Sequence, residues 1–416
     1  MDVLDFTTLL NIECYVITRC EKEDVSQSLN FYLEPTTSRV CCSKCGNLTT
    51  NNSRHIHRSI RDIPIGVYMK VYLHYEVIDY KCPFCKGYTH YSLPLVSSHA
   101  RVTDRFRMYI GKMCNLLSPK EVSEEFDLDD NTVYRYEKYF LERKLSAVNF
   151  DNLVHIGVDE ISFRKGHKYM TIVYDMTSGK AIPIFYAKGK TKEALQSFYD
   201  QLTQEQKSTI KTVNMDMSTS YIPCTEENLK NVDIVIDKFH VIKELNKRVE
   251  EERKVLFTEI YRNDKEVFNS HEKKKVRWAV LKRPENLTEN QQLVLEKLQE
   301  INEPIYQVYL LKEQFYKIYS LENKHNAKVQ MLSWIETVQG TCFENLKKFA
   351  DTVVNHFRWI MTYFEHGTTS SKIEGVNNKI KVIKRLAYGY SDLDYFFQKI
   401  RSKFCNMPRF FVLFST

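Results

Sequence analysis

The chain has 416 residues, 43% of them hydrophobic and 27% charged, with a formal net charge of +7. This length exceeds one small domain, so we expect two to four folding units with sizeable cores. No apolar run is long enough to cross a bilayer, and residues 1–14 lack the pattern of a signal peptide. We therefore expect a cytoplasmic protein rather than a membrane or secreted one, and the modest charge alone does not indicate nucleic-acid binding.

Two Cys-x-x-Cys pairs lie close to the N-terminus, in short turns that carry Gly or Pro. Each pair presents two thiolates at the spacing that tetrahedral zinc requires. The segment between them is long, so we predict a zinc ribbon with a β-rich insert and one structural Zn²⁺. The predicted ligands are Cys42, Cys45, Cys82 and Cys85. The alternatives are Cys41 in place of Cys42, and as fourth ligand His55, His57 or His90.

Residues 118–139 predict two short helices joined by a tight turn. Ser118 is a capping residue with Pro119 at the first helical position, and Asn131 begins the second helix. This is the layout of a helix-turn-helix, whose second helix reads base edges in the major groove. A plain helical hairpin explains the motif alone equally well, and the zinc pattern upstream favours DNA. The predicted DNA contacts are Asn131, Thr132, Tyr134 and Arg135.

Residues 153–242 alternate short apolar runs with amphipathic segments, a pattern typical of an α/β sheet. The order is three strands, a helix, a strand, a helix and a strand, which is the order of an RNase H-like core. The predicted strands are 154–159, 168–174, 181–186, 210–216 and 232–237, with a helix around 193–202.

Three acids fall at positions suited to metal-dependent phosphoryl transfer. Asp159 ends the first strand, Asp216 ends the fourth, and Glu374 lies on a later cationic helix whose apolar residues recur at helical spacing. Two Mg²⁺ or Mn²⁺ ions held about 3.5–4 Å apart by such carboxylates activate a water or a 3′-hydroxyl. Asp175 is an alternative ligand, and Asp216 could instead cap a loop.

These motifs together resemble those of bacterial insertion-sequence transposases, in the DDE family first described in lactobacilli. The matching stretches are residues 157–169, 214–218, 237–243 and 374–389, and the order of motifs matches across nearly the whole chain. The resemblance implies that Asp159, Asp216 and Glu374 form a catalytic triad, with Asp237 and His240 nearby. It also implies binding to double-stranded terminal inverted repeats, DNA cleavage and strand transfer, and at least a homodimer that joins two ends.

The resemblance also implies a domain organisation, an α/β core with an all-helical insertion. We expect a zinc ribbon (1–95), a helix-turn-helix domain (100–145), an RNase H-like domain (150–242 and 366–405) and a helical insertion (243–365). Two rival functions remain open, a non-catalytic DNA-binding regulator and a metal-dependent nuclease that cuts without joining.

Two basic clusters are predicted to contact DNA phosphates. Trp278 lies beside the first cluster, and we expect it to pack in the core of the helical insertion. The basic residues are Lys273, Lys274, Lys275 and Arg277 in the insertion, and Lys379, Lys381, Lys384 and Arg385 on the final acidic helix.

Overall fold

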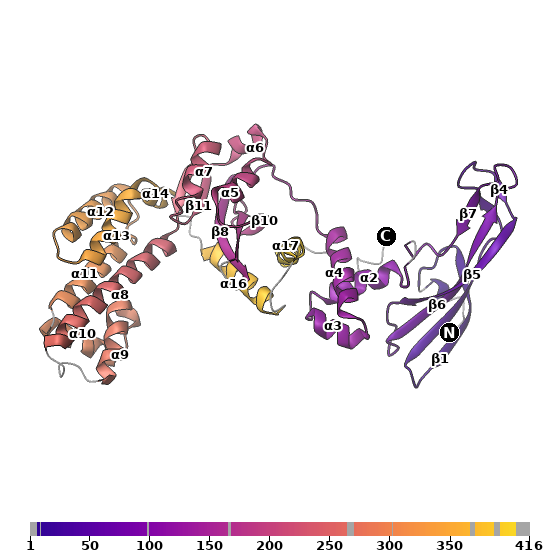
Figure 1. Cartoon of the computed structure of the whole chain (residues 1–416), viewed down its shortest axis with the longest axis horizontal. Helices are drawn as coiled ribbons and strands as arrows, with labels where there is room; N and C mark the ends of the chain where they lie inside the picture. Colours follow the sequence, from indigo (N-terminus) through magenta and orange to yellow (C-terminus); the bar gives the residue numbers. More distant parts are fainter. Residues whose placement is uncertain are drawn as a thin grey trace. The chain divides into compact units, whose positions relative to one another are not determined.

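The computed structural model is a mixed α/β protein with two compact units, Met1–Ala147 with Ser391–Thr416, and Val148–Tyr390 (Figure 1). No helix in the described part of the chain is long and apolar enough to cross a membrane. The structure describes residues 6–8, 10–97, 100–164, 168–263, 270–301, 303–366, 371–386 and 392–404.

The first unit contains a five-stranded sheet in the order β1-β2-β6-β5, with β7 paired to β6. Side chains of β6 alternate between the core and the surface, as the sequence pattern of residues 68–80 predicts. Val71 and Leu73 on its inward face share a hydrophobic core with Phe31 of β2. The strands are β1 (Tyr15–Glu23), β2 (Ser28–Pro35), β5 (Asn52–Asp62), β6 (Lys70–Lys81) and β7 (Tyr88–Tyr91), with a small hairpin of β3 (Val40–Cys41) and β4 (Leu48–Thr49).

A helical group completes the first unit. Ser118 caps α3 through a capping box with Glu121, and Asp129 caps α4, so the predicted pair of helices is present. The C-terminal helix α17 packs on α4, where Lys399 forms a buried ion pair with Glu137. The helices are α2 (Asp104–Met113), α3 (Pro119–Phe126), α4 (Asp130–Lys144) and α17 (Leu393–Ser402).

The second unit is built on a five-stranded sheet in the order β10-β9-β8-β11-β12. The strands β8, β9 and β10 form an antiparallel meander, and β11 runs parallel to both β8 and β12. All four residues of β11 are buried, as expected for a central parallel strand. The elements are β8 (His155–Arg164), β9 (Lys168–Asp175), β10 (Ile182–Lys188), α5 (Lys192–Tyr199), α6 (Gln204–Thr209), β11 (Thr212–Met215), α7 (Tyr221–Asn228) and β12 (Asp233–Ile236).

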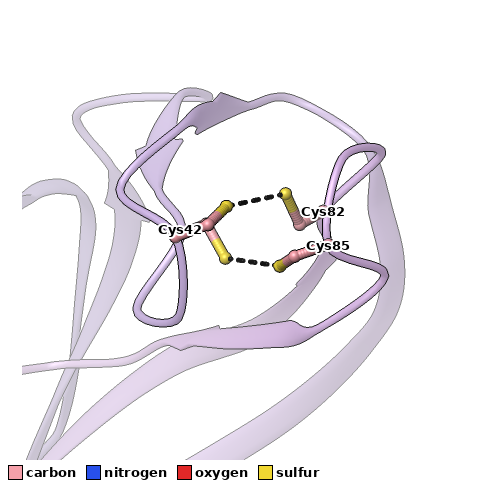
Figure 2. Close-up of side chains that lie close together, drawn as sticks. Cys42, Cys82 and Cys85 are labelled. Carbon is pink, nitrogen blue, oxygen red and sulfur yellow. Dashed lines mark hydrogen bonds between the residues drawn. The ribbon is translucent and has the colours of Figure 1, made fainter.

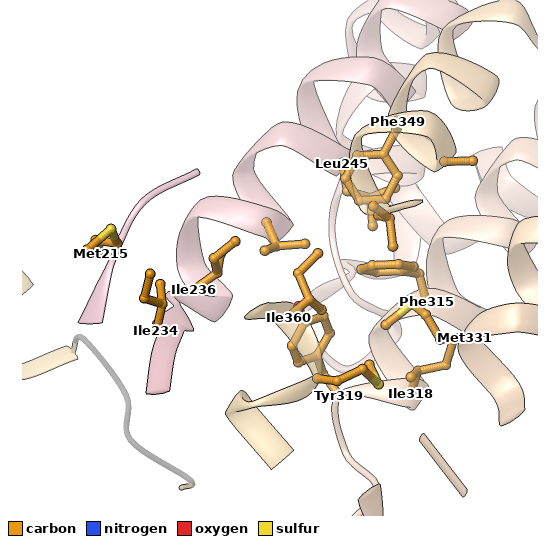
Figure 3. Close-up of a cluster of buried hydrophobic side chains, with 14 of the residues drawn as sticks. Met215, Ile234, Ile236, Leu245, Phe315, Ile318, Tyr319, Met331, Phe349 and Ile360 are labelled. Atoms are coloured by element: carbon orange, nitrogen blue, oxygen red, sulfur yellow. The ribbon is translucent and has the colours of Figure 1, made fainter. Parts of the chain in front are cut away.

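A helical region follows β12 and shares one hydrophobic core with the sheet. Figure 3 shows this core running from Met215 and Ile236 to Leu245, Phe315 and Ile360. The long helix α8 begins directly after β12, so sheet and helices are joined without a linker. The helices are α8 (Lys238–Asn263), α9 (Ser270–Leu281), the 3-10 turn η1 (Pro284–Asn286), α10 (Glu289–Ile301), α11 (Glu303–Ile318), α12 (Lys324–Gln339), α13 (Glu344–Asn355), α14 (Phe357–Met361) and α15 (Tyr363–His366).

The prediction that Trp278 packs in this core is wrong. Its side chain is 48% exposed, and Arg277 lies over its ring. The tryptophan that packs in this core is Trp334, whose indole N–H donates to the Leu311 carbonyl at 2.8 Å. The α9 residues that face the core are Val276, Ala279 and Val280.

Helix α16 (Ser371–Leu386) packs against β8, and its predicted apolar stripe is confirmed as buried. The contact centres on Gly157. A Cβ atom at that position would lie 2.4 Å from Ile373 Cδ1 and 2.9 Å from Met176 Sδ. An added Cβ would therefore force Ile373 and Met176 to shift, so a residue without a side chain suits this close approach of α16. The stripe consists of Ile373, Val376, Ile380 and Ile383.

We expect Gly157→Ala to lower the free energy of unfolding by about 1–3 kcal/mol, because the added methyl overpacks the contact between β8 and α16. Gly375→Ala on α16 is the matched control, since its Cβ would meet open space. Alanine there should be neutral or stabilising by up to about 1 kcal/mol through helix propensity. Urea unfolding of both variants measures these free energies. Equal changes in the two variants would show that the close approach of α16 to Gly157 does not contribute to stability.

Candidate functional site

The strand register of the second unit brings three aspartates into line. Asn214 of β11 pairs with Gly157 of β8 and with Val235 of β12. Two residues after these paired positions come Asp159, Asp216 and Asp237. Side chains two residues apart point to the same face of a sheet, so each aspartate faces the same side as the paired residue before it. Three acids from adjacent strands therefore face one side of the sheet, at the edge where β11 and β12 end.

All three aspartates line a cavity of about 560 Å³, and Glu374 of α16 lines the same cavity. Glu374 lies in the first turn of α16 and is exposed, whereas Asp237 is buried. The predicted acids thus come together from β8, from the end of β11 and from α16. Other lining residues include His240 and Lys243 of α8, and Asn377, Lys381 and Lys384 of α16.

Asp159 is held by two hydrogen bonds. Its Oδ2 accepts from Asn377 Nδ2 at 2.5 Å, and its Oδ1 accepts from the Glu160 backbone N–H at 2.7 Å. Burial raises the pKa of Asp159 and the negative charge of Asp216 adds to the rise, while those hydrogen bonds and His240 oppose it. The carboxylate is therefore rigidly placed in an environment that penalises its charge.

Asp216 has fewer compensating contacts. Burial raises its pKa and Asp237 adds to the rise, whereas His240 and Lys190 oppose it. Its Oδ1 is buried and has no hydrogen-bond partner among the described residues. A buried carboxylate oxygen without a donor is costly, and a cation is the partner that would remove the cost. The sequence also allowed Asp216 to cap the following loop. Ser218 has that role instead, since its Oγ accepts from the Tyr221 N–H at 3.3 Å.

Asp237 and His240 form a linked pair at the start of α8. Asp237 Oδ1 accepts from the Phe239 N–H at 2.9 Å, and Oδ2 lies 3.1 Å from His240 Nδ1. Burial lowers the pKa of His240, but the hydrogen bond to Asp237 and the charges of Asp159 and Asp216 outweigh it, so the pKa is raised. The raised pKa favours the cationic form of His240 beside Asp159 and Asp216, whereas Asp237 carries the opposite charge.

Asn377 is a site residue that sequence reasoning did not assign. It is buried on α16, donates to Asp159 and accepts from the Tyr174 hydroxyl at 2.6 Å. The only sequence signal was its position one turn after Glu374, which a surface asparagine would share. The alternative ligand Asp175 lies outside the cavity and accepts from the Thr177 N–H at 2.8 Å, as a turn residue.

The carboxylates at the cavity do not form a tight cluster of ligand atoms. Within the described ranges, only two sets of three or more such residues have all their ligand atoms within 4.8 Å of one another. One is the four cysteines of the first unit. The other is an exposed surface set of Asp233, Glu365 and His366.

The four predicted cysteines converge from two turns. The sulfurs of Cys42 and Cys85 are 3.5 Å apart and those of Cys45 and Cys82 are 3.6 Å apart. Figure 2 shows the thiols of both turns pointing toward one another. The backbone N–H groups of Lys44 and Cys45 lower the pKa of the Cys42 thiol to about 6, whereas burial and the neighbouring thiols raise the pKa of Cys85 to about 11. Without metal, Cys42 is thus the member of the cluster that favours the thiolate.

The two cysteine turns have the same backbone pattern. The Cys42 N–H donates to the Asn47 carbonyl and the Gly46 N–H to the Cys42 carbonyl, both at 2.9 Å. In the second turn Cys82 and Lys86 make the equivalent bonds. The fifth residue of each turn has a positive φ, +75° at Gly46 and +59° at Lys86. Both turns are thus shaped to aim two thiols at one point.

The alternative zinc ligands lie elsewhere. Cys41 is exposed on β3 and is not part of the cluster. His55 and His57 of β5 both pair with Glu76. His90 of β7 pairs with Asp79 at 2.5 Å.

The residues predicted to read DNA do not all face outward on α4. Asn131 and Arg135 are exposed, and Thr132 accepts from Arg135 Nη2 at 3.0 Å. Tyr134 instead donates to Asp392 at 2.7 Å, and its ring packs edge-on against Tyr395 of α17. The Tyr134 hydroxyl is thus engaged within the protein, and its contact with DNA stays a prediction.

The residues of the two predicted basic clusters also differ in their surroundings: some are paired within the protein and others are exposed. In the insertion, Arg277 pairs with Glu250 at 3.3 Å and Lys275 is partly buried, while the side chains of Lys273 and Lys274 lie outside the described residues. On α16, the Lys384 ammonium donates to the Ser162 carbonyl at 2.5 Å beside the cavity. Lys379 and Arg385 are exposed on the same helix and do not line the cavity.

Comparison with known proteins identifies the class of this chain as a transposase. Residues 156–400 match the family model of the ISL3 transposases, whose description reads "Transposase". The transposase for insertion sequence element IS1001 of Bordetella parapertussis is 29% identical over 396 residues, covering 95% of this chain and 96% of that protein. The transposase for insertion sequence element IS1557 of Mycobacterium tuberculosis is 26% identical over 369 residues, covering 84% of this chain and 82% of that protein. The chain belongs to the ISL3 family of transposases.

We expect the purified chain to contain one Zn²⁺, held by the four clustered cysteines. Cys82→Ser should remove the ion and lower the melting temperature of the first unit, because a structural zinc contributes folding energy directly. Cys41→Ser, next to a ligand but outside the cluster, should keep both. Elemental analysis and thermal melting measure the two quantities, and a zinc-free wild type or an equal effect of Cys41→Ser would contradict the assignment.

Proposed function

We propose that this transposase is a DDE enzyme in which Asp159, Asp216 and Glu374 hold the catalytic metal ions. The observation that carries the proposal is the meeting of these three carboxylates at one cavity, from three separate parts of the chain. The sheet supports it, because an antiparallel meander followed by two parallel strands in the order β10-β9-β8-β11-β12 is the arrangement of an RNase H-like core.

The residues at the cavity fit Mg²⁺ or Mn²⁺. These ions prefer oxygen ligands, and Mg²⁺ is commonly bound through one or two carboxylates while it keeps several waters. The unpartnered Oδ1 of Asp216 is an available oxygen of this kind. Burial raises the pKa values of Asp159 and Asp216 and neighbouring acids add to the rise, so a cation bound here would offset the cost of their charge. When bound, two such ions polarise a water or a DNA 3′-hydroxyl and stabilise the departing oxygen.

The protein's own groups hold the site and its substrate. Asn377 fixes Asp159, and the positive charge at His240 offsets the acids beside it. Lys381 and Lys384 bring cations to the cavity wall, where a DNA phosphate would lie. Lys379 and Arg385 extend this positive surface along α16 and contact DNA beyond the cavity.

DNA ends are bound by the first unit in this proposal. The four-cysteine site holds structural Zn²⁺, and α3 with α4 acts as a helix-turn-helix whose exposed residues enter the major groove. Asn131, Thr132 and Arg135 contact base edges of the terminal inverted repeats. Because two ends must be brought together, the active form is a homodimer or larger.

We expect Asp159→Asn to abolish Mg²⁺-dependent cleavage at the element's ends while leaving binding to those ends unchanged, because it removes ligand charge without changing shape. Asp175→Asn is the matched control, since an asparagine oxygen also accepts the turn hydrogen bond from Thr177. Gel shift and strand-cleavage assays on the terminal repeats measure both activities. Full cleavage by Asp159→Asn would refute the catalytic assignment.

We expect Asn377→Leu to raise the Mg²⁺ concentration needed for cleavage by about 10–100-fold, because outer-shell partners orient metal ligands. Asn378→Leu on the exposed face of the same helix should leave the Mg²⁺ dependence unchanged. Cleavage rates across a Mg²⁺ titration give the comparison. The positioning role would be excluded by equal Mg²⁺ dependence of the two variants.

A further inference from the structure

A second cavity, of about 640 Å³, lies in the first unit between α2, α4 and the segment that precedes α2. Four of its described lining residues are cationic and one, Glu142, is acidic. Acidic neighbours take up part of this charge, since Lys138 lies 3.4 Å from Asp392. The four cations are Arg101, Arg107, Arg135 and Lys138.

An aromatic ring organises the positive charge at this cavity. The guanidinium carbons of Arg107 and Arg143 lie 4.1 and 4.3 Å from the centre of the Tyr139 ring. Arg107 also pairs with Asp104, and its buried Nε has no hydrogen-bond partner among the described residues. Arg107 is therefore held in place before any ligand arrives, which reduces the entropy lost on binding.

We propose that this cavity binds backbone phosphates of duplex DNA, beside the base pairs that the start of α4 contacts. The proposal rests on the DNA-binding function proposed above. Arginine guanidinium groups match phosphate oxygens in a bidentate geometry. A site lined by so many cations differs from the mostly apolar pockets that take small molecules.

The position of the cavity along α4 fits the dimensions of DNA. Lys138 lies seven residues after Asn131, which is about 10 Å along a helix axis. The major groove is about 12 Å wide, so a helix that inserts Asn131 between the groove walls brings Lys138 close to the phosphates at its edge. Arg135 lies between these two positions and lines the cavity.

The test measures DNA binding without cleavage, in the full-length chain carrying Asp159→Asn. Arg101→Gln and Lys138→Gln are combined, and Kd is measured over a range of salt for a terminal-repeat duplex and for a scrambled duplex. Loss of two phosphate contacts should weaken both duplexes by the same factor and reduce the slope of log K against log salt by about 2.

The matched control combines Lys22→Gln and Arg54→Gln, which remove two exposed cations from the sheet of the same unit. It should leave the slope unchanged, and thermal melting verifies that both double variants are folded. An unchanged slope for the cavity variant, an equal change in the control, or a loss confined to the terminal-repeat duplex would overturn the cavity proposal alone. Failure of the parent chain to bind either duplex would overturn the DNA-binding function as well.

Discussion

Two partly buried carboxylates on neighbouring strands, Asp159 and Asp216, impose the main electrostatic constraint on the second unit. Burial raises the pKa of each, and the charge of Asp216 raises that of Asp159 further. Hydrogen bonds compensate Asp159, but Asp216 keeps a buried oxygen without a described donor. Such a pair weakens the fold unless positive charge is supplied. His240 and Lys190 oppose the rise in the pKa of Asp216, and a divalent cation would compensate the acids further.

The backbone explains how these acids meet. Parallel pairing of β11 with β8 and β12 sets the three aspartates in one phase, so their convergence follows from strand register. Glu374 reaches the cavity because Gly157 lets α16 lie against β8. Asn377, one turn later on the same helix, then bonds to Asp159 and to Tyr174. One close helix–strand contact therefore places both an acid and the group that orients another acid.

Local patterns in the sequence predicted much of this arrangement. The strands of the second unit, the buried stripe on α16 and the cysteine turns each depend on neighbours within a few residues, so spacing alone indicates them. Contacts between distant residues were not accessible. Asn377 bonds to Asp159 across 218 positions, and Tyr134 turns toward Asp392 across 258. Trp278 was expected in the core because it is a large aromatic residue, yet in the packed helices it is exposed and Trp334 is buried.

The most direct measurement of the central claim is an anomalous difference map from crystals grown with Mn²⁺. The account predicts density within coordination distance of Asp159 and Asp216, adjacent to Glu374, that disappears in crystals of Asp159→Asn. The exposed set of Asp233, Glu365 and His366 is the competing position, because its ligand atoms already lie within 4.8 Å of one another. Density at that surface set with none at the cavity would contradict the account.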